Sequence, residues 1–173
     1  SQNTYKGLVG NFLIYAELDS GREHDPNPEA FRLPAGPFDV PLAVSDKQFD
    51  PITHKLVFDP FNLDGFLGEH AVVNGAVTPF MHVLRRKYRF RIVVNGPSRI
   101  FTFRTCAVGS DGVECADDEA ATDLILVGND GNLLASPVPV DNVTISPAER
   151  FDVVIDFSQF HGGDRINLMN IAD

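Results

Sequence analysis

The feature that most constrains the fold is the run KYRFRIVV at residues 87–94, in which apolar and basic side chains alternate. On an extended chain, successive side chains point to opposite sides, so the two kinds of residue separate onto two faces. The apolar face comprises Tyr88, Phe90, Ile92 and Val94, and the basic face comprises Lys87, Arg89 and Arg91. This period of two predicts a half-buried antiparallel strand whose apolar face covers a core.

Similar short apolar runs, separated by Gly, Pro, Asn and Asp, fill the rest of the chain. An Asn74-Gly75 step favours a tight turn between two short strands, because both residues tolerate positive φ. In the run at 99–106 we expect Ile100 to point inward. The predicted strands are a buried one at 7–16 and others at 41–49, 56–58, 87–94, 99–106 and 164–171. Two more flank Asn74-Gly75, and two lie within 143–157, joined at Pro147. The run at 123–134 is a further strand that ends in a turn at 128–131.

These runs, with no amphipathic helix among them, predict an all-β sandwich. The chain has 173 residues, enough for one domain with its own core, and it contains no repeat or internal linker. The stretch at 19–37 is polar and rich in Pro and Gly, so we expect a surface loop there. The opening Ser1-Gln2-Asn3 has no initiator Met, which fits a processed protein or an excised fragment.

Charge argues against nucleic acid as a partner. The formal net charge is −10, and such a balance repels phosphate backbones. Five basic residues do gather at Arg85, Arg86, Lys87, Arg89 and Arg91. We interpret them as the outward face of a strand that pairs with carboxylates, rather than as an anion site. No apolar stretch approaches the roughly 20 residues of a membrane span.

A copper site of the blue type needs two His and one Cys, usually with a weak axial Met. Neither Cys106 nor Cys115 has a His near it, and His161 and Met169 have no Cys before them. Multinuclear copper sites use His-x-His pairs, and the histidines, at 24, 54, 70, 82 and 161, form none. We therefore assign no metal-binding, catalytic or cofactor-binding residue. The sequence leaves a Cys106–Cys115 disulfide and two free thiols both open.

Other motifs are weak. The acidic loop at 109–123 could offer calcium ligands from Asp111, Asp117, Asp118, Glu119 and Asp123, but the EF-hand spacing is absent. Asn142-Val143-Thr144 is a glycosylation sequon on or beside a strand, where a chance match is the simpler explanation. The chain contains no nucleophile elbow, P-loop or dinucleotide fingerprint.

Several runs resemble the middle domain of multicopper oxidases of the spore-coat laccase, bilirubin oxidase and phenoxazinone synthase type. They are YKGLVGNFLI at 5–14, PLAVSD at 41–46, VNGAVTP at 73–79, KYRFRIVVN at 87–95, GNDGNLL at 128–134 and PAERFDVVIDF at 147–157. They follow the family's order and span nearly the whole chain. The resemblance implies a Greek-key cupredoxin-like β-sandwich over residues 1–173, with residues 1–16 closing, or bridging from, a preceding domain.

The resemblance also implies a function at the level of a larger parent enzyme. Such enzymes oxidise phenolic, aromatic or metal substrates by single electrons at a mononuclear copper and reduce O₂ to water at a trinuclear centre. The middle domain carries none of the copper ligands, spaces the outer domains and is not catalytic alone. Its partners would be the flanking cupredoxin domains, and its location extracytoplasmic: secreted, periplasmic or in a spore coat.

Two other hypotheses stay open. The chain could be a free-standing β-sandwich binding module that uses its acidic loop or its Arg face. It could also belong to a copper enzyme whose ligands come from partner chains. Natural termini at Ser1 and Asp173 in the mature protein would favour the first, and copper in the complete sample would favour the second.

Overall fold

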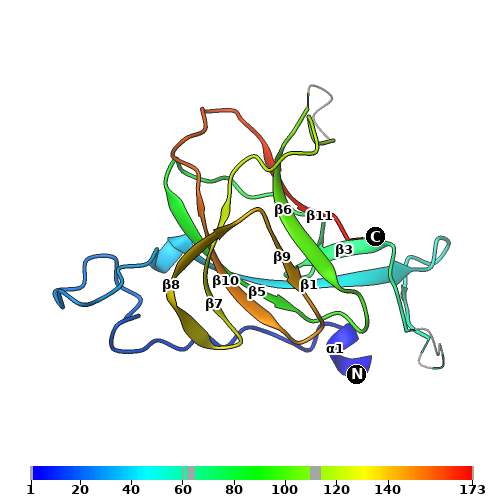
Figure 1. The fold of residues 1–173 in the computed structure, drawn as a ribbon. Helices are drawn as coiled ribbons and strands as arrows, with labels where there is room; N and C mark the ends of the chain where they lie inside the picture. Colours follow the sequence, from blue (N-terminus) through cyan, green and yellow to red (C-terminus); the bar gives the residue numbers. More distant parts are fainter. Residues whose placement is uncertain (1, 60, 62–64, 110–113, 173) are drawn as a thin grey trace.

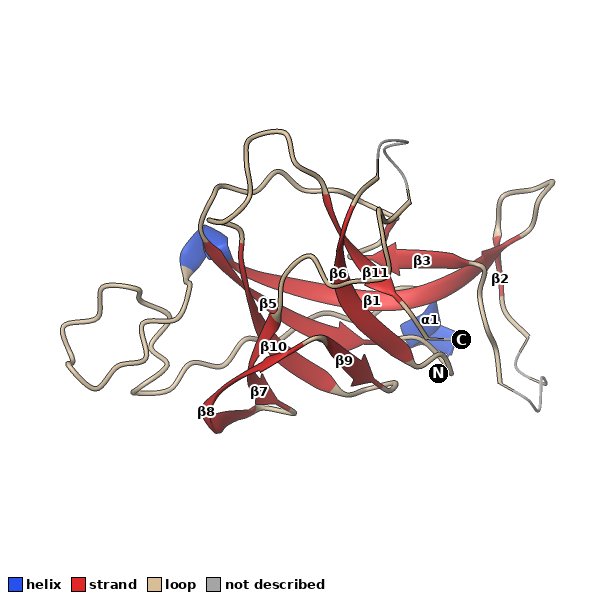
Figure 2. Ribbon diagram, turned by 45° about the horizontal axis from the view of Figure 1, so that its top comes forward, coloured by secondary structure: helices blue, strands red, loops and turns tan. Residues whose placement is uncertain are grey.

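The computed structural model describes residues 2–59, 61, 65–109 and 114–172. Strands dominate it, and they build two sheets that face each other across an apolar core (Figures 1 and 2). The elements are α1 (Gln2–Tyr5), η1 (Gly36–Phe38), β1 (Asp39–Phe49), β2 (Leu56–Val57), β3 (His70–Val73), β4 (Ala76–Val77), β5 (Lys87–Val94), β6 (Phe101–Ala107), β7 (Leu124–Asn129), β8 (Asn132–Val140), β9 (Asn142–Ile145), β10 (Arg150–Asp156) and β11 (Ile166–Asn170).

The larger sheet has the strand order β4-β3-β1-β5-β10-β7-β8, with β2 paired to one end of β1. The smaller sheet has the order β11-β6-β9 and covers one face of the larger (Figure 1). Their facing side chains form one cluster, in which Ile92, Val153 and Ile145 are among the most deeply buried. The predicted all-β sandwich with a single core is therefore confirmed.

Strand β5 is the centre of the larger sheet, and its predicted apolar face is confirmed. Tyr88, Phe90, Ile92 and Val94 are all at most 5% exposed and contribute to the core. The prediction of antiparallel pairing holds only for β10, because β1 runs parallel to β5. A parallel neighbour needs a crossover connection, and the long stretch between β1 and β5 supplies it.

Two tight turns join neighbouring strands. Asn74 and Gly75 have φ of 50° and 84° between β3 and β4, as predicted for a two-residue hairpin. Asp130 and Gly131 have φ of 44° and 89° and join β7 to β8. The second turn is shorter than the predicted 128–131 turn, since the first two of those residues still belong to β7.

Strand β8 was not predicted beyond residue 134. It contains Pro137 and Pro139, and proline argues against a central strand because it cannot donate a ladder hydrogen bond. Here β8 lies at the edge of the larger sheet, where a missing donor is tolerated. The edge position of β8, which the sequence does not reveal, therefore explains why a segment with two prolines still forms a strand.

The prediction that Ile100 points inward is wrong. Ile100 lies before β6 and is 49% exposed, whereas Phe101 and Phe103 are buried and stack with their ring centroids 5.4 Å apart. Ile100 and Phe101 are adjacent apolar residues, so either could have pointed toward the core. Phe101 and Phe103 take that side because their rings bury more apolar area there.

The prediction of a buried strand at 7–16 is also wrong. After α1 the chain has no regular secondary structure until η1, and Leu8, Phe12 and Ile14 are 74%, 89% and 70% exposed. We call residues 7–16 the N-terminal segment. It is attached to the larger sheet by polar contacts, such as that of the Asn11 side-chain amide, which donates to the Arg91 carbonyl oxygen at 3.1 Å. An apolar run predicts burial but does not say which surface covers it.

Candidate functional site

The five histidines do not form a common site. His24, His54, His82 and His161 lie in four different loops, and His70 lies on β3. All five are exposed, as predicted for surface histidines. Among the described residues, no group of three or more His, Cys, Asp or Glu side chains is arranged to hold a metal ion.

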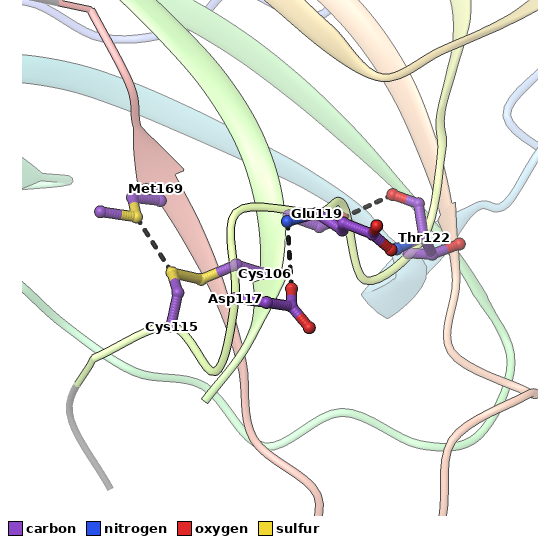
Figure 3. Close-up of a disulfide and its surroundings, with 7 residues drawn as sticks. Cys106, Cys115, Asp117, Glu119, Thr122 and Met169 are labelled. Carbon is purple, nitrogen blue, oxygen red and sulfur yellow. Dashed lines mark hydrogen bonds between the residues drawn. A yellow bond between two sulfur atoms is a disulfide. The ribbon is translucent and has the colours of Figure 1, made fainter. Parts of the chain in front are cut away.

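The two cysteines, the chain's entire complement, form a disulfide. Cys106 comes from β6 and Cys115 from the loop that follows it, and their Cα atoms are 5.6 Å apart (Figure 3). A mononuclear blue-copper site requires a cysteine thiolate, and a disulfide sulfur is not one. In this state the residues present therefore do not fit such a copper site.

The predicted calcium ligands lie on the same loop, except that Asp111 falls outside the described residues. Asp117, Asp118, Glu119 and Asp123 are all exposed. One oxygen of Asp117 accepts a hydrogen bond from the Glu119 amide at 3.0 Å, which shapes a local turn (Figure 3). The structure thus gives Asp117 a role in shaping the loop and does not bring the four described carboxylates together around a centre.

The sequon asparagine, Asn142, is exposed at the start of β9. The hydroxyl group of Thr144 lies 3.0 Å from that of Thr102 on the neighbouring strand. Asn142 therefore lies on the surface, and the threonine of the sequon takes part in the contact between β6 and β9.

The basic face of β5 holds the most organised polar cluster. Arg89 is 1% exposed, and its guanidinium donates two hydrogen bonds to Asp19, at 2.8 and 2.9 Å, and a third to Asp152. Burial by itself lowers the pKa of Arg89, but the two carboxylates outweigh it and hold that pKa above its ordinary value. The predicted outward face that pairs with carboxylates is confirmed, and the structure adds that Arg89 on this face is covered rather than exposed to solvent.

Arg91 extends this cluster along the strand. Its guanidinium donates two hydrogen bonds of 2.8 Å to Asp39, which also accepts a 3.0 Å hydrogen bond from the Tyr15 hydroxyl. Burial lowers the pKa of Arg91 while Asp39 raises it, and the net shift is upward. Partial burial and the contact with Asp39 both raise the pKa of Tyr15. Bidentate arginine–carboxylate pairs of this kind fix geometry, which suits a structural role.

These contacts attach the irregular N-terminal part of the chain to the sheet. Asp19 and Tyr15 belong to it, and further along Glu23 accepts 2.6 Å hydrogen bonds from Arg86, the residue before β5. Sequence reasoning missed Asp19 as the partner of Arg89. No spacing links two residues 70 positions apart, and the only available signal was a carboxylate in a Pro- and Gly-rich region opposite an Arg-rich strand.

An open groove lies between the N-terminal segment and strands β1 and β3 of the larger sheet. Its volume is about 390 Å³, and its lining includes Val9, Asn11, Ala43, Lys47 and Val72. Burial lowers the pKa of Lys47, whose amine lies 4.3 Å from the centre of the Tyr5 ring. The walls combine small apolar groups with side-chain amides.

Two stretches expose large apolar side chains. The first is the N-terminal segment. The second runs from Phe80 to Leu84 ahead of β5, where Phe80 is 85% exposed, Met81 45% and Leu84 63%. Contiguous exposed apolar residues of this kind are a feature of contact surfaces and ligand-binding grooves. Within the described residues, neither of the short helices has the length or the apolar content of a membrane span.

No protein-family model matches the chain, but individual proteins do. The laccase of Bacillus subtilis (strain 168) is 32% identical over 181 residues, which cover 98% of this chain and 31% of that protein. The bilirubin oxidase of Albifimbria verrucaria is 32% identical over 177 residues, covering 99% of this chain and 27% of the oxidase.

A solved structure agrees. The McoA multicopper oxidase from the hyperthermophile Aquifex aeolicus matches with a TM-score of 0.66 and 32% sequence identity, over 77% of this chain and 27% of that one. This chain thus spans only 27% to 31% of the length of these relatives. By its sequence along almost its whole length and by the architecture of its sandwich, the chain belongs to the multicopper oxidase family as a cupredoxin-like domain.

Proposed function

We propose that the chain is the copper-free, structural middle domain of a multicopper oxidase. The parent protein would couple one-electron oxidation of phenolic, aromatic or metal substrates to the reduction of O₂ to water. In this proposal the mononuclear and trinuclear copper centres belong to flanking cupredoxin domains of the same parent chain. The domain described here separates those domains and forms part of the wall around the substrate.

The observation that carries the proposal is the Cys106–Cys115 disulfide. It occupies both sulfur atoms that could act as thiolate ligands, and it places them beside a loop without histidine. A domain built this way lacks the ligand on which a blue-copper electron acceptor depends. The disulfide also favours an oxidising, extracytoplasmic location, since such bonds persist mainly there.

The exposed apolar stretches support the role of a spacer. Phe12 and Phe80 would be costly on the surface of a free-standing domain, because each aromatic ring exposes a large apolar area to water. We propose that flanking domains cover these stretches, and that residues 1–16 form the bridge to the preceding one. The buried contacts of Arg89 with Asp19 and of Arg91 with Asp39 would then hold the irregular stretch before β1 in a fixed position on the larger sheet.

The test compares the chain with the complete product of its gene. We expect the oxidised 173-residue chain, dialysed against Cu(II), to retain no copper, to lack a blue absorption band and to consume no O₂ with a phenol. We expect the full-length product to contain copper and to oxidise the phenol. Copper held tightly by the oxidised chain alone would overturn the proposal.

The same experiment addresses the free-standing alternative. A mature protein that ends near Ser1 and Asp173 and contains no copper would identify a binding module instead. In the full-length protein, a Phe12→Asp substitution should weaken domain assembly and increase protease sensitivity. The matched variant Ile52→Asp changes an equally exposed residue on the β1–β2 connection and provides the control.

A further inference from the structure

Three of the four cysteine and methionine sulfur atoms of the chain lie together on the outer side of the smaller sheet. Two of them form the Cys106–Cys115 disulfide, and the thioether sulfur of Met169 lies 3.0 Å from Sγ of Cys115 (Figure 3). Because a disulfide sulfur carries no hydrogen, this approach is a direct sulfur–sulfur contact. Such a cluster is a set of soft ligand atoms in one place.

The sheet register fixes two of the three sulfur atoms. Cys106 on β6 is opposite Asn167 on β11, and Met169 is two residues further along, opposite Arg104. Side chains two residues apart point to the same face, and directly opposed residues share a face. Cys106 and Met169 are therefore diagonal neighbours on one ladder, at a separation that long side chains bridge.

The loop carrying Cys115 is held in place by hydrogen bonds as well as by the disulfide. The amide of Gly109 donates to the Glu114 carbonyl at 2.7 Å, and the amide of Ala116 donates to the Ala107 carbonyl at 2.8 Å. These bonds enclose a bridge between Val108 and Cys115. Breaking the sulfur–sulfur bond would thus leave both cysteines close to each other and to Met169.

We propose that reduction of this disulfide creates a three-sulfur binding site for the cuprous ion, formed by Cys106, Cys115 and Met169. A dithiol or phosphine reductant supplies two electrons, two protons are taken up, and the disulfide becomes two thiols. Cu(I) then displaces the thiol protons and binds two thiolates and the thioether, without any change in its own oxidation state.

The ligand chemistry selects the metal. Thiolates bind both Zn²⁺ and Cu(I), but a thioether is not among the usual ligands of protein zinc sites, so the Met169 sulfur favours Cu(I). Met169 is 43% exposed while Cys106 is 1% exposed, so the ion would enter from the methionine side and reach a protected thiolate. The site is closed in the oxidised chain, and this inference does not depend on the proposed function of the domain.

The experiment is an anaerobic titration of Cu(I) between the chain and a chromophoric Cu(I) chelator. We expect the reduced chain to take one Cu(I) from the chelator and the oxidised chain to take none. Met169→Leu should weaken binding at least about tenfold, because loss of even an outer-shell partner of a metal typically costs about 10- to 100-fold in affinity. Cys115→Ser should abolish the competition. Met81→Leu, which changes the other methionine, should bind like the reduced wild-type chain.

Far-UV circular dichroism of each reduced sample verifies that the β-sheets persist, and X-ray absorption at the copper edge counts the sulfur ligands. Equal affinity of the reduced wild-type chain and Met169→Leu would overturn the inference, as would loss of the sheets on reduction. Competition by the oxidised chain would overturn it too, because the thiolates would then be unnecessary.

Discussion

On the inner face of β5, the apolar side chains around Ile92 pack against the smaller sheet, whereas on the outer face Arg89 and Arg91 lie beneath an irregular stretch of chain. The inner face is stabilised by removal of apolar area from water and tolerates any well-shaped apolar neighbour. The outer face depends on particular partners, because a buried guanidinium requires carboxylates in matching positions. The inner face of β5 thus tolerates changes among apolar residues, whereas its outer face requires specific carboxylate partners.

Asp19→Ala should have the largest effect on this comparison. It would leave Arg89 buried with Asp152 as its remaining close carboxylate, and we expect a loss of about 4 kcal/mol in the free energy of unfolding. Urea denaturation measures it, with the exposed Asp118→Ala as control. A loss below about 1 kcal/mol would place this pair with ordinary surface ion pairs.

Ile92→Ala is the matching change on the inner face. Ile92 is fully buried in the core, so removal of its side chain should cost about 3 kcal/mol through lost burial and a residual cavity. The same denaturation experiment applies. Ile92→Val should cost much less, and equal losses for the two variants would contradict the view that this face responds in proportion to the volume removed.

Acid should weaken the contact by which the irregular stretch around Glu23 is attached to Arg86, beside β5. The Arg86 guanidinium lowers the pKa of Glu23 below its unfolded value. The contribution of this pair is therefore complete above the ordinary carboxyl range and is lost as the pH falls through the lowered pKa. Both side chains are partly exposed, so Glu23→Gln should cost at most about 1 kcal/mol at pH 7.

The difference between wild type and Glu23→Gln should shrink on acidification, and unfolding curves recorded at about pH 7 and about pH 3.5 measure it. A difference that stayed constant, or grew, on acidification would mean that the negative charge on Glu23 is not what attaches this region to β5.

Arg150→Ala should have the smallest effect. Arg150 pairs with Asp130 at 3.1 Å, but both side chains are about half exposed. We expect a change within about 0.5 kcal/mol. A larger loss, measured by thermal unfolding beside Asp19→Ala, would show that burial does not account for the difference between the two arginine–carboxylate pairs.

The sequence by itself determined the all-β architecture, most strand positions, the apolar face of β5 and the Asn74-Gly75 turn. Each of these depends on alternation or on local φ preferences, which neighbouring residues set. It also limited the candidate site, because the spacing of Cys and His can be read directly.

Only the tertiary structure decided the burial of Arg89, the exposure of the N-terminal segment, the edge position of β8 and the meeting of Met169 with the disulfide. All four depend on contacts between residues far apart in the chain. Period-two patterning tells which residues share a face but not what covers that face. The segment that covers each face is decided by packing between parts of the chain that are far apart, and no spacing in the sequence links those parts.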